Sequence, residues 1–173
     1  FYGRLFLNLF ASDPYSVTSH QSEPMRRAVA NLARREKIDV WQLEWTGYLP
    51  MLDRAISGPR VVIAHNVDTL IWQRYFENER NPIKRAFLKT QWRKFAYFER
   101  RAFREATRVV AVSEEDAQLI RTEFGQPKVD VRHVDGQRCG DVVADALEVG
   151  IAVECGEPAR HAARVVVVDR QID

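Results

Sequence analysis

Residues 59–70, PRVVIAHNVDTL, constrain the fold of this chain more than any other stretch. Within it, Arg60–Ala64 is a short run of apolar, largely β-branched residues that shows no alternation with polar ones. Such a run, bounded upstream by Ser-Gly-Pro, is typical of a strand buried on both faces of a parallel sheet. It ends abruptly at His65 and Asn66. Because open α/β sheets bind ligands outside the carboxyl ends of their strands, we expect any functional site to lie near these two residues.

The segments around this strand alternate between helical and extended patterns. Helices are predicted over residues 22–37, 49–56, 70–76, 82–105 and 113–124. Besides Arg60–Ala64, strands are predicted over residues 39–45, 108–112 and 128–131. Residues 14–20 are predicted as a loop. Ser113 with Asp116 three residues later resembles a helix-opening cap. This order predicts an α/β fold, a Rossmann-like parallel sheet between helices.

Composition narrows the class of protein. With 173 residues, 46% hydrophobic and 29% charged, the chain has room for one globular core.

Cys139 and Cys155 show neither C-x-x-C spacing nor histidines arranged as zinc ligands, so neither a disulfide framework nor a metal site is expected. The apolar start, residues 1–10, is too short to span a bilayer, and because no initiator Met is present we expect the chain to begin inside a longer protein.

Two familiar catalytic motifs are missing. No G-x-G-x-x-G occurs, so the usual dinucleotide site has no support, and no cofactor is predicted. Ser113 followed by Glu114 suggests a nucleophile, but no G-x-S-x-G elbow surrounds it, and helix capping explains it better. An α/β hydrolase or a kinase is therefore a weak alternative.

Two polar residues follow neighbouring predicted strands. His65 could contact a ligand, or it could be a loop histidine that ties down its neighbours, and its position fits both interpretations. Glu44 ends the preceding strand, so the two side chains could flank one crevice. Its carboxylate could accept hydrogen bonds from sugar hydroxyls or cap a helix, and the structural role is slightly favoured.

The net charge of +2 hides a local excess of Lys and Arg over residues 84–108. This basic run is commonly a solvated helix face, but its pairing with apolar residues also suits an anionic membrane or a phosphate-rich acceptor. Four tryptophans are predicted to line the core or a groove. They carry no RNA-binding motif, so no nucleic-acid partner is expected. The tryptophans are Trp41, Trp45, Trp72 and Trp92.

The composition changes from about Val134. The segment to Asp173 contains no Lys, Phe, Trp, Tyr, Ser, Thr or Asn. We predict two regions, residues 1–132 as a partial Rossmann-like domain and 133–173 as an atypical, frameshifted or non-homologous tail. Residues 141–147 suit a helix and Val165–Val168 a strand, but with no aromatic and few long aliphatic side chains the tail is not expected to complete the sheet.

Three segments in this order resemble a known family. They are PRVVIAHNVD at residues 59–68, YFERRAFR at 97–104 and RVVAVSEED at 108–116, and together they resemble the amino-terminal domain of family 4 glycosyltransferases, most closely the bacterial exopolysaccharide type. The resemblance covers about residues 14–131. The resemblance rests on the ordered set of the three segments.

The resemblance implies one half of a GT-B fold that transfers a sugar, with retention, from a nucleotide-sugar donor to a saccharide or lipid-linked acceptor. His65, which matches the family's histidine after this strand, would be the catalytic residue that reaches the donor sugar. From their places at the strand ends, Glu44 and Asn66 are predicted as further substrate-binding residues. The family's first strand would precede Phe1, and a carboxyl-terminal domain would bind the nucleotide. Without them, we expect this piece to be inactive. The parent would be cytoplasmic, in part at the inner face of the membrane. The rival hypothesis is a non-catalytic α/β binding domain.

Overall fold

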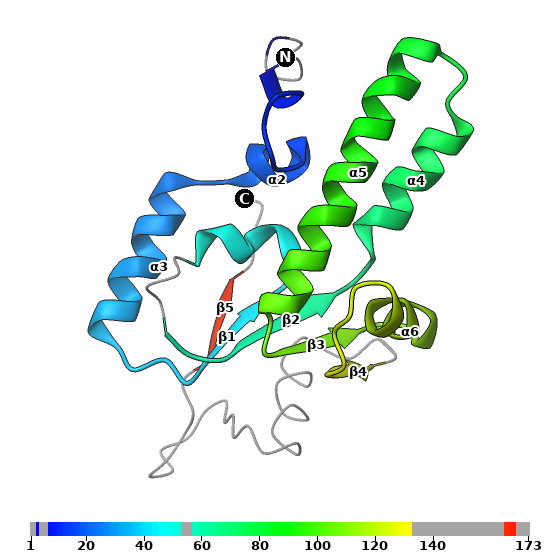
Figure 1. Cartoon of the computed structure of the whole chain (residues 1–173). Coiled ribbons are helices and arrows are strands. Elements are labelled where there is room, and N and C mark those ends of the chain that lie inside the picture. Colours follow the sequence, from blue (N-terminus) through cyan, green and yellow to red (C-terminus); the bar gives the residue numbers. More distant parts are fainter. Residues whose placement is uncertain (1–2, 4–6, 53–56, 133–164, 169–173) are drawn as a thin grey trace.

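A parallel β-sheet forms the centre of the molecule. The computed structural model describes residues 3, 7–52, 57–132 and 165–168. Within them, five parallel strands pair in the order β4-β3-β2-β1-β5 (Figure 1). The strands are β1 (Val40–Leu43), β2 (Arg60–Ala64), β3 (Arg108–Ala111), β4 (Val129–Val131) and β5 (Val165–Val168). This sheet with its flanking helices confirms the predicted Rossmann-like α/β class.

Helices connect these strands. In Figure 1, α4 and α5 form a long antiparallel hairpin that extends beyond the sheet, whereas α3 lies at the opposite side of the molecule. The helices are α2 (Tyr15–His20), α3 (Glu23–Arg35), the 3-10 helix η1 (Thr46–Met51), α4 (Asp68–Asn78), α5 (Pro82–Glu105) and α6 (Glu114–Thr122). The predictions for α3, α4, α5 and α6 are confirmed to within a few residues.

Local capping explains where three helices begin. The Ser22 hydroxyl accepts a hydrogen bond from the amide of Met25 at the start of α3. The Asn81 side chain accepts two backbone amides at the start of α5, where Pro82 occupies the first turn. At α6, the Ser113 hydroxyl accepts the Asp116 amide at 3.1 Å, which confirms the predicted capping role of Ser113. Gly125 follows α6 with a φ of 72°, a conformation that favours glycine.

Strand residues alternate between two buried faces. Trp41, Leu43, Val62 and Ala64 join a large cluster to which α3, η1, α5 and α6 contribute, including Phe95, Phe98 and Phe103 of α5. The opposite face carries a smaller buried cluster of Val40, Val61, Ile63 and Val110. Burying one such side chain fully is worth roughly 1.5–3 kcal/mol, so β1 and β2 are firmly held up to their carboxyl ends.

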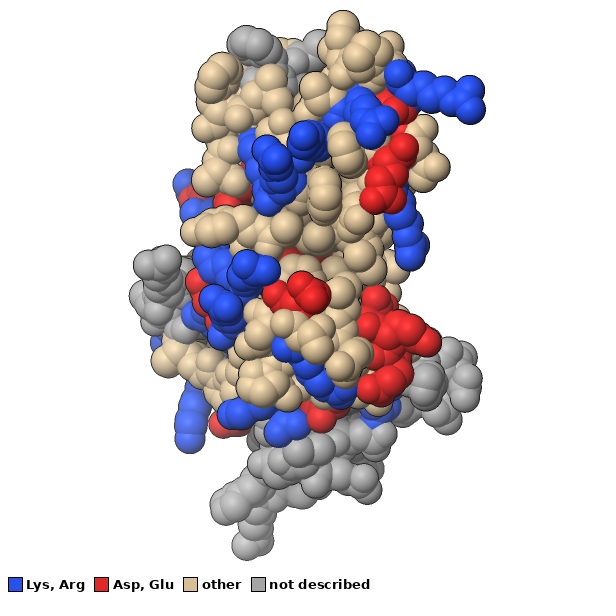
Figure 2. Space-filling view, turned by 45° about the vertical axis from the view of Figure 1, so that its right-hand side comes forward, with Lys and Arg blue, Asp and Glu red and all other residues tan. Residues whose placement is uncertain are grey.

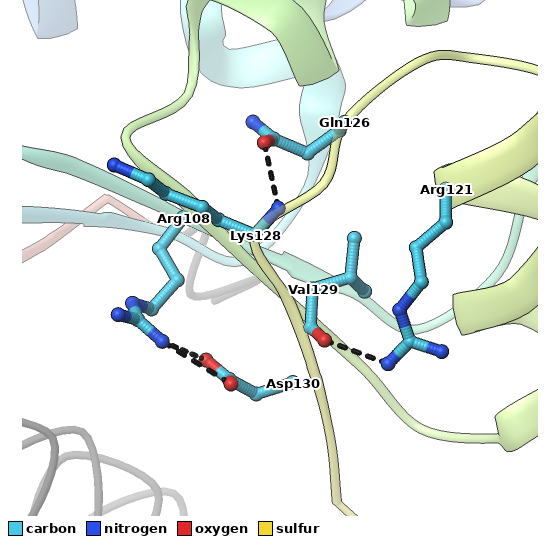
Figure 3. Close-up of polar contacts among 6 residues, drawn as sticks. All are labelled: Arg108, Arg121, Gln126, Lys128, Val129 and Asp130. Carbon is cyan, nitrogen blue, oxygen red and sulfur yellow. Dashed lines mark hydrogen bonds and ion pairs between the residues drawn. The ribbon is translucent and has the colours of Figure 1, made fainter.

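Polar contacts fix the β3–β4 end of the sheet (Figure 3). Arg108 at the start of β3 donates to both carboxylate oxygens of Asp130 on β4, at 2.9 and 3.2 Å. Arg121 of α6 donates to the Val129 carbonyl at 2.8 Å. The buried Gln126 side chain accepts the Lys128 amide. It also donates to the Phe103 carbonyl near the end of α5 and to the carbonyl of Ala106, the residue that follows the helix. This edge therefore holds α5, α6 and β4 together.

Two predictions upstream of β2 are wrong. Residues 15–20 form α2 and not a loop: Pro14 stands at the cap position, and Val17 is buried in the large core cluster. The helix predicted over residues 49–56 is replaced by η1, which begins earlier and contains Pro50. A proline in that position removes a backbone donor and disfavours a continued α-helix. Residues 53–56 lie outside the described part of the chain.

The strand predicted at Val165–Val168 is confirmed, but the expectation that the tail would not complete the sheet is wrong. β5 pairs with β1 in parallel, with Val40 opposite Val165 and Leu43 opposite Val168. Four consecutive β-branched residues suit such an edge position, which asks mainly for main-chain pairing and not for aromatic side chains. Val166 packs against the large cluster. The helix predicted at residues 141–147 lies outside the described residues.

Candidate functional site

Glu44 and His65 meet at the carboxyl ends of β1 and β2. Glu44 directly follows β1 and His65 directly follows β2, and the two strands pair in parallel. The Nε2 atom of His65 lies 3.1 Å from the Oε2 atom of Glu44. The structure thus brings together the two residues that the sequence placed at one crevice.

The two side chains differ in exposure, which gives them different roles. The Glu44 side chain is 9% exposed and that of His65 is 53% exposed. Glu44 is also held by Gln42, whose amide nitrogen donates to Oε1 at 2.5 Å. A carboxylate that accepts from one ring nitrogen sets the tautomer, so Nδ1 of a neutral His65 remains as an acceptor. The arrangement can therefore present an oriented imidazole to a hydroxyl group.

The loop after His65 is short and changes from exposed to buried. Asn66 is exposed, whereas Val67 is buried and stands at the amino-terminal cap position of α4. Among the described contacts, no hydrogen bond of the Asn66 side chain is found. Asn66 thus lies beside His65 at the open end of the sheet, where a ligand could reach both.

Sequence reasoning missed several residues that support this site. The indole Nε1 of Trp45 donates to Oδ2 of Asp68 at 2.5 Å, which ties the end of β1 to the start of α4. His20 packs edge-on against the Trp45 ring at 5.4 Å between centroids. A Cβ at position 47 would overlap that ring, which explains Gly47. Trp45 was recognisable from its position after Glu44, but nothing in the sequence pointed to His20.

Glu99 of α5 is the most buried charged residue beneath the loop. Its carboxyl group accepts the amides of Asp68 and Thr69 at 2.8 and 2.9 Å, and the Thr69 hydroxyl at 2.6 Å. Burial raises the pKa of Glu99 to about 8; the Thr69 hydroxyl opposes this rise and the Asp68 charge adds to it. Burial also raises the pKa of Asp68, against the effect of the Trp45 hydrogen bond.

A cavity of about 270 Å³ lies away from this loop. It is lined by Arg60 at the start of β2 and by Glu105 at the end of α5, so it belongs to the opposite end of the sheet. His65 follows Arg60 by five residue steps along the strand, a span of roughly 16 Å. The Glu44–His65 end is the candidate site, because polar side chains converge there.

The described residues offer neither a metal site nor a membrane-spanning helix. Among those residues, no group of three or more His, Cys, Asp or Glu side chains could hold a metal ion. None of the described helices is long and apolar enough to cross a membrane. Cys139 and Cys155 lie outside the described residues.

The family follows from a comparison with known proteins. Residues 13–134 match the model of Glycosyltransferase Family 4. The chain belongs to this family. Comparison with curated proteins and with solved structures returns no match. Family membership means that the substrates contain sugars, and the parallel sheet with flanking helices is consistent with one half of a GT-B glycosyltransferase.

Proposed function

We propose that this chain is the acceptor-side half of a retaining glycosyltransferase of the bacterial exopolysaccharide type. It would move a sugar from a nucleotide-sugar donor to a saccharide or lipid-linked acceptor. The observation that carries the proposal is the Glu44–His65 pair, 3.1 Å apart at adjacent strand ends, in a chain of Glycosyltransferase Family 4.

His65 would act by contacting the transferred sugar. Its half-exposed ring can accept a hydroxyl hydrogen bond at Nδ1 while Nε2 donates to the buried Glu44 carboxylate. A contact that strengthens in the transition state raises the rate of the chemical step, whereas uniform binding does not. Glu44 would orient the ring, and Asn66 would offer its amide to a neighbouring hydroxyl group.

The donor nucleotide would be bound by a carboxyl-terminal domain joined to this chain. The sequence has no phosphate-binding glycine motif, which supports this division of labour. The donor is then a co-substrate, no separate cofactor is required, and the present piece would not turn over alone. We place the parent enzyme in the cytoplasm, where nucleotide sugars serve as donors.

A membrane partner would suit a lipid-linked acceptor. Lys and Arg side chains are spread over the face in Figure 2, and some of them lie on its upper half, the part of the molecule that contains the α4–α5 hairpin. Exposed members on α5 are Lys84, Arg85, Lys89 and Arg93, and beside them Ile83 is 81% exposed. Basic charge next to an exposed apolar side chain favours an anionic lipid surface. We propose that this end of the hairpin contacts the inner face of the membrane.

Sugar transfer by the parent enzyme tests the proposal. The chain joined to its carboxyl-terminal domain is incubated with a panel of nucleotide sugars and a lipid-linked acceptor, and nucleotide release and product are measured. We expect release with at least one donor, and proton NMR should show the donor's anomeric configuration in the product. Product with the opposite configuration contradicts retention. No release with any donor favours the rival, a non-catalytic α/β binding domain.

A further inference from the structure

The amino terminus of α4 lacks a cap of its own. The first amides of an α-helix have no partner within the helix, and Ser, Thr, Asp or Asn at the cap position normally accepts them. Val67 occupies that position here and its side chain cannot accept a hydrogen bond. A partner must therefore come from elsewhere in the fold.

Glu99 supplies that partner from another helix. It lies 31 residues from Asp68 in the sequence, and its Oε1 accepts the Asp68 amide at 2.8 Å. Its Oε2 accepts both the amide and the hydroxyl of Thr69, at 2.9 and 2.6 Å. Glu99 has 0% exposure. Burying a carboxyl group costs free energy, which a local Ser or Asn cap would avoid, so this arrangement does more than cap a helix.

The cap defines one end of the loop that carries the site. Pairing of Ala64 with Ala111 of β3 fixes the last residue of β2. Asp68 begins α4, so only residues 65–67 lie between the two fixed points. With both ends held, such a short loop has few conformations, and His65 is kept within reach of Glu44.

We propose that Glu99 is a positioning residue that holds His65 and Asn66 in place by capping α4 from α5. Its effect on the loop is independent of the reaction, whereas its effect on turnover rests on the proposed glycosyltransferase function. Glu99 does not touch the reacting atoms. It acts through the amides of Asp68 and Thr69.

Amide hydrogen exchange on this chain tests the cap. The variants are Glu99→Gln and the milder Thr69→Val, with Thr69→Ser as the conservative replacement that keeps the hydroxyl group. The matched control is Gln91→Leu, because Gln91 is equally buried on α5 but contacts the Tyr15 amide and the Asn8 side chain. We expect Asp68 and Thr69 amides to exchange about tenfold faster or more in Glu99→Gln and Thr69→Val. The His65 ring signals in NMR spectra should shift in the same variants.

The control and the conservative variant decide between positioning and general destabilisation. Gln91→Leu should leave the two amides and the His65 signals as in the wild type even where its melting temperature falls, and Thr69→Ser should restore wild-type values. Unchanged exchange in both Glu99→Gln and Thr69→Val, or equal acceleration in Gln91→Leu, overturns the proposal. If Glu99→Gln does not fold, Thr69→Val decides alone.

Turnover by the parent enzyme separates this inference from the proposed function. We expect Thr69→Val to lower kcat several-fold with little change in KM, and to lower it no further when His65→Ala is already present. Additive losses in the double variant contradict positioning through His65. If the wild-type enzyme transfers no sugar, the proposed function fails, and the exchange measurements still decide the role of Glu99.

Discussion

Glu44 and His65 form one unit, although the sequence allowed each a separate role. The structural role was slightly favoured for Glu44, and the contacts described for its carboxylate join it to His65 and Gln42. A charge-assisted hydrogen bond to a histidine fixes both the tautomer and the ring orientation. The half-exposed His65 can face a substrate because the nearly buried Glu44 holds it.

Glu44→Gln in the parent enzyme should lower kcat/KM by about threefold to tenfold, because a charged hydrogen bond becomes a neutral one worth roughly 1 kcal/mol less. The melting temperature should change by only a few degrees, since the side chain keeps its size. Steady-state kinetics and thermal unfolding of one preparation give both values. A large loss of stability with normal kcat/KM would return Glu44 to a purely structural role.

Glu99 should make the stability of this chain depend on pH. Its folded pKa is about 8, above the ordinary value of 4.5, so between these values the folded state binds a proton that the unfolded state releases. Stability from this group is therefore greatest below about pH 4.5 and falls as pH rises toward 8. Asp68, whose carboxyl pKa is also raised, is the charged group that acts on Glu99.

The measurement compares wild type and Glu99→Gln by urea unfolding at about pH 6 and about pH 9. We expect the wild type to lose more stability over this interval than the variant, in which the side chain at position 99 cannot ionise. Parallel losses in the two proteins would show that Glu99 does not titrate in this range.

Helix α5 divides into two halves with different environments. Toward its carboxyl end, Phe95, Phe98, Ala102 and Phe103 are buried. At its amino end, Ile83 has the helical spacing of the same apolar face but is 81% exposed. The helical spacing of apolar residues identifies one apolar face of α5. That face is covered only where the sheet lies beneath it, and the α4–α5 hairpin extends past the sheet (Figure 1).

Several basic residues of α5 have partners within the chain. Lys94 donates to the Asn8 carbonyl, Arg100 donates to the Glu123 carbonyl, and Arg101 pairs with Asp13 and Glu105. Near the amino end, Lys84 and Arg93 are exposed, and Arg85 and Lys89 are exposed although they also lie over the Phe76 ring. Most of the exposed charge that could meet a membrane is therefore at this end of the helix. This moves the membrane hypothesis from the whole basic run to the exposed end of the hairpin.

Replacing Lys84, Lys89 and Arg93 by Gln should weaken binding of the parent enzyme to vesicles that contain anionic lipid. Each charge near such a surface is worth up to roughly 1 kcal/mol, so a loss of about tenfold to a hundredfold is expected. The control replaces Arg26, Arg34 and Arg35 of α3, which removes the same exposed charge elsewhere. Equal binding by both triple variants would leave the basic run as a solvated helix face.

Across the whole molecule, local sequence patterns predicted most helices and strands. Contacts between residues far apart in the sequence were not predicted. β2 and α5 begin and end where expected, because a β-branched run, an Asn-Pro cap and a long helical stripe mark them in the sequence. The site end of the sheet followed from the direction of parallel strands. The cap that Glu99 forms on α4 could not be predicted from the sequence, because it depends on which turn of α5 lies beneath α4.

In the tail, residues 133–173, amino-acid composition was a poor guide to strand pairing. The tail lacks the side chains of a core, yet Val165–Val168 adds a strand beside β1. Edge pairing uses backbone groups that every residue has, so composition alone could not exclude it. The predicted boundary between residues 132 and 133 remains a prediction.

The central claim is that His65 contacts the sugar and does not merely stabilise its loop. The decisive measurement is kcat/KM of the parent enzyme carrying His65→Ala, beside its melting temperature in the same preparation. A hydrogen bond gained in the transition state is worth roughly 1–3 kcal/mol, so we predict a loss of about tenfold to a hundredfold. Stability should change little, because truncating a half-exposed ring leaves no core cavity. Normal kcat/KM with a clear drop in melting temperature would contradict the account.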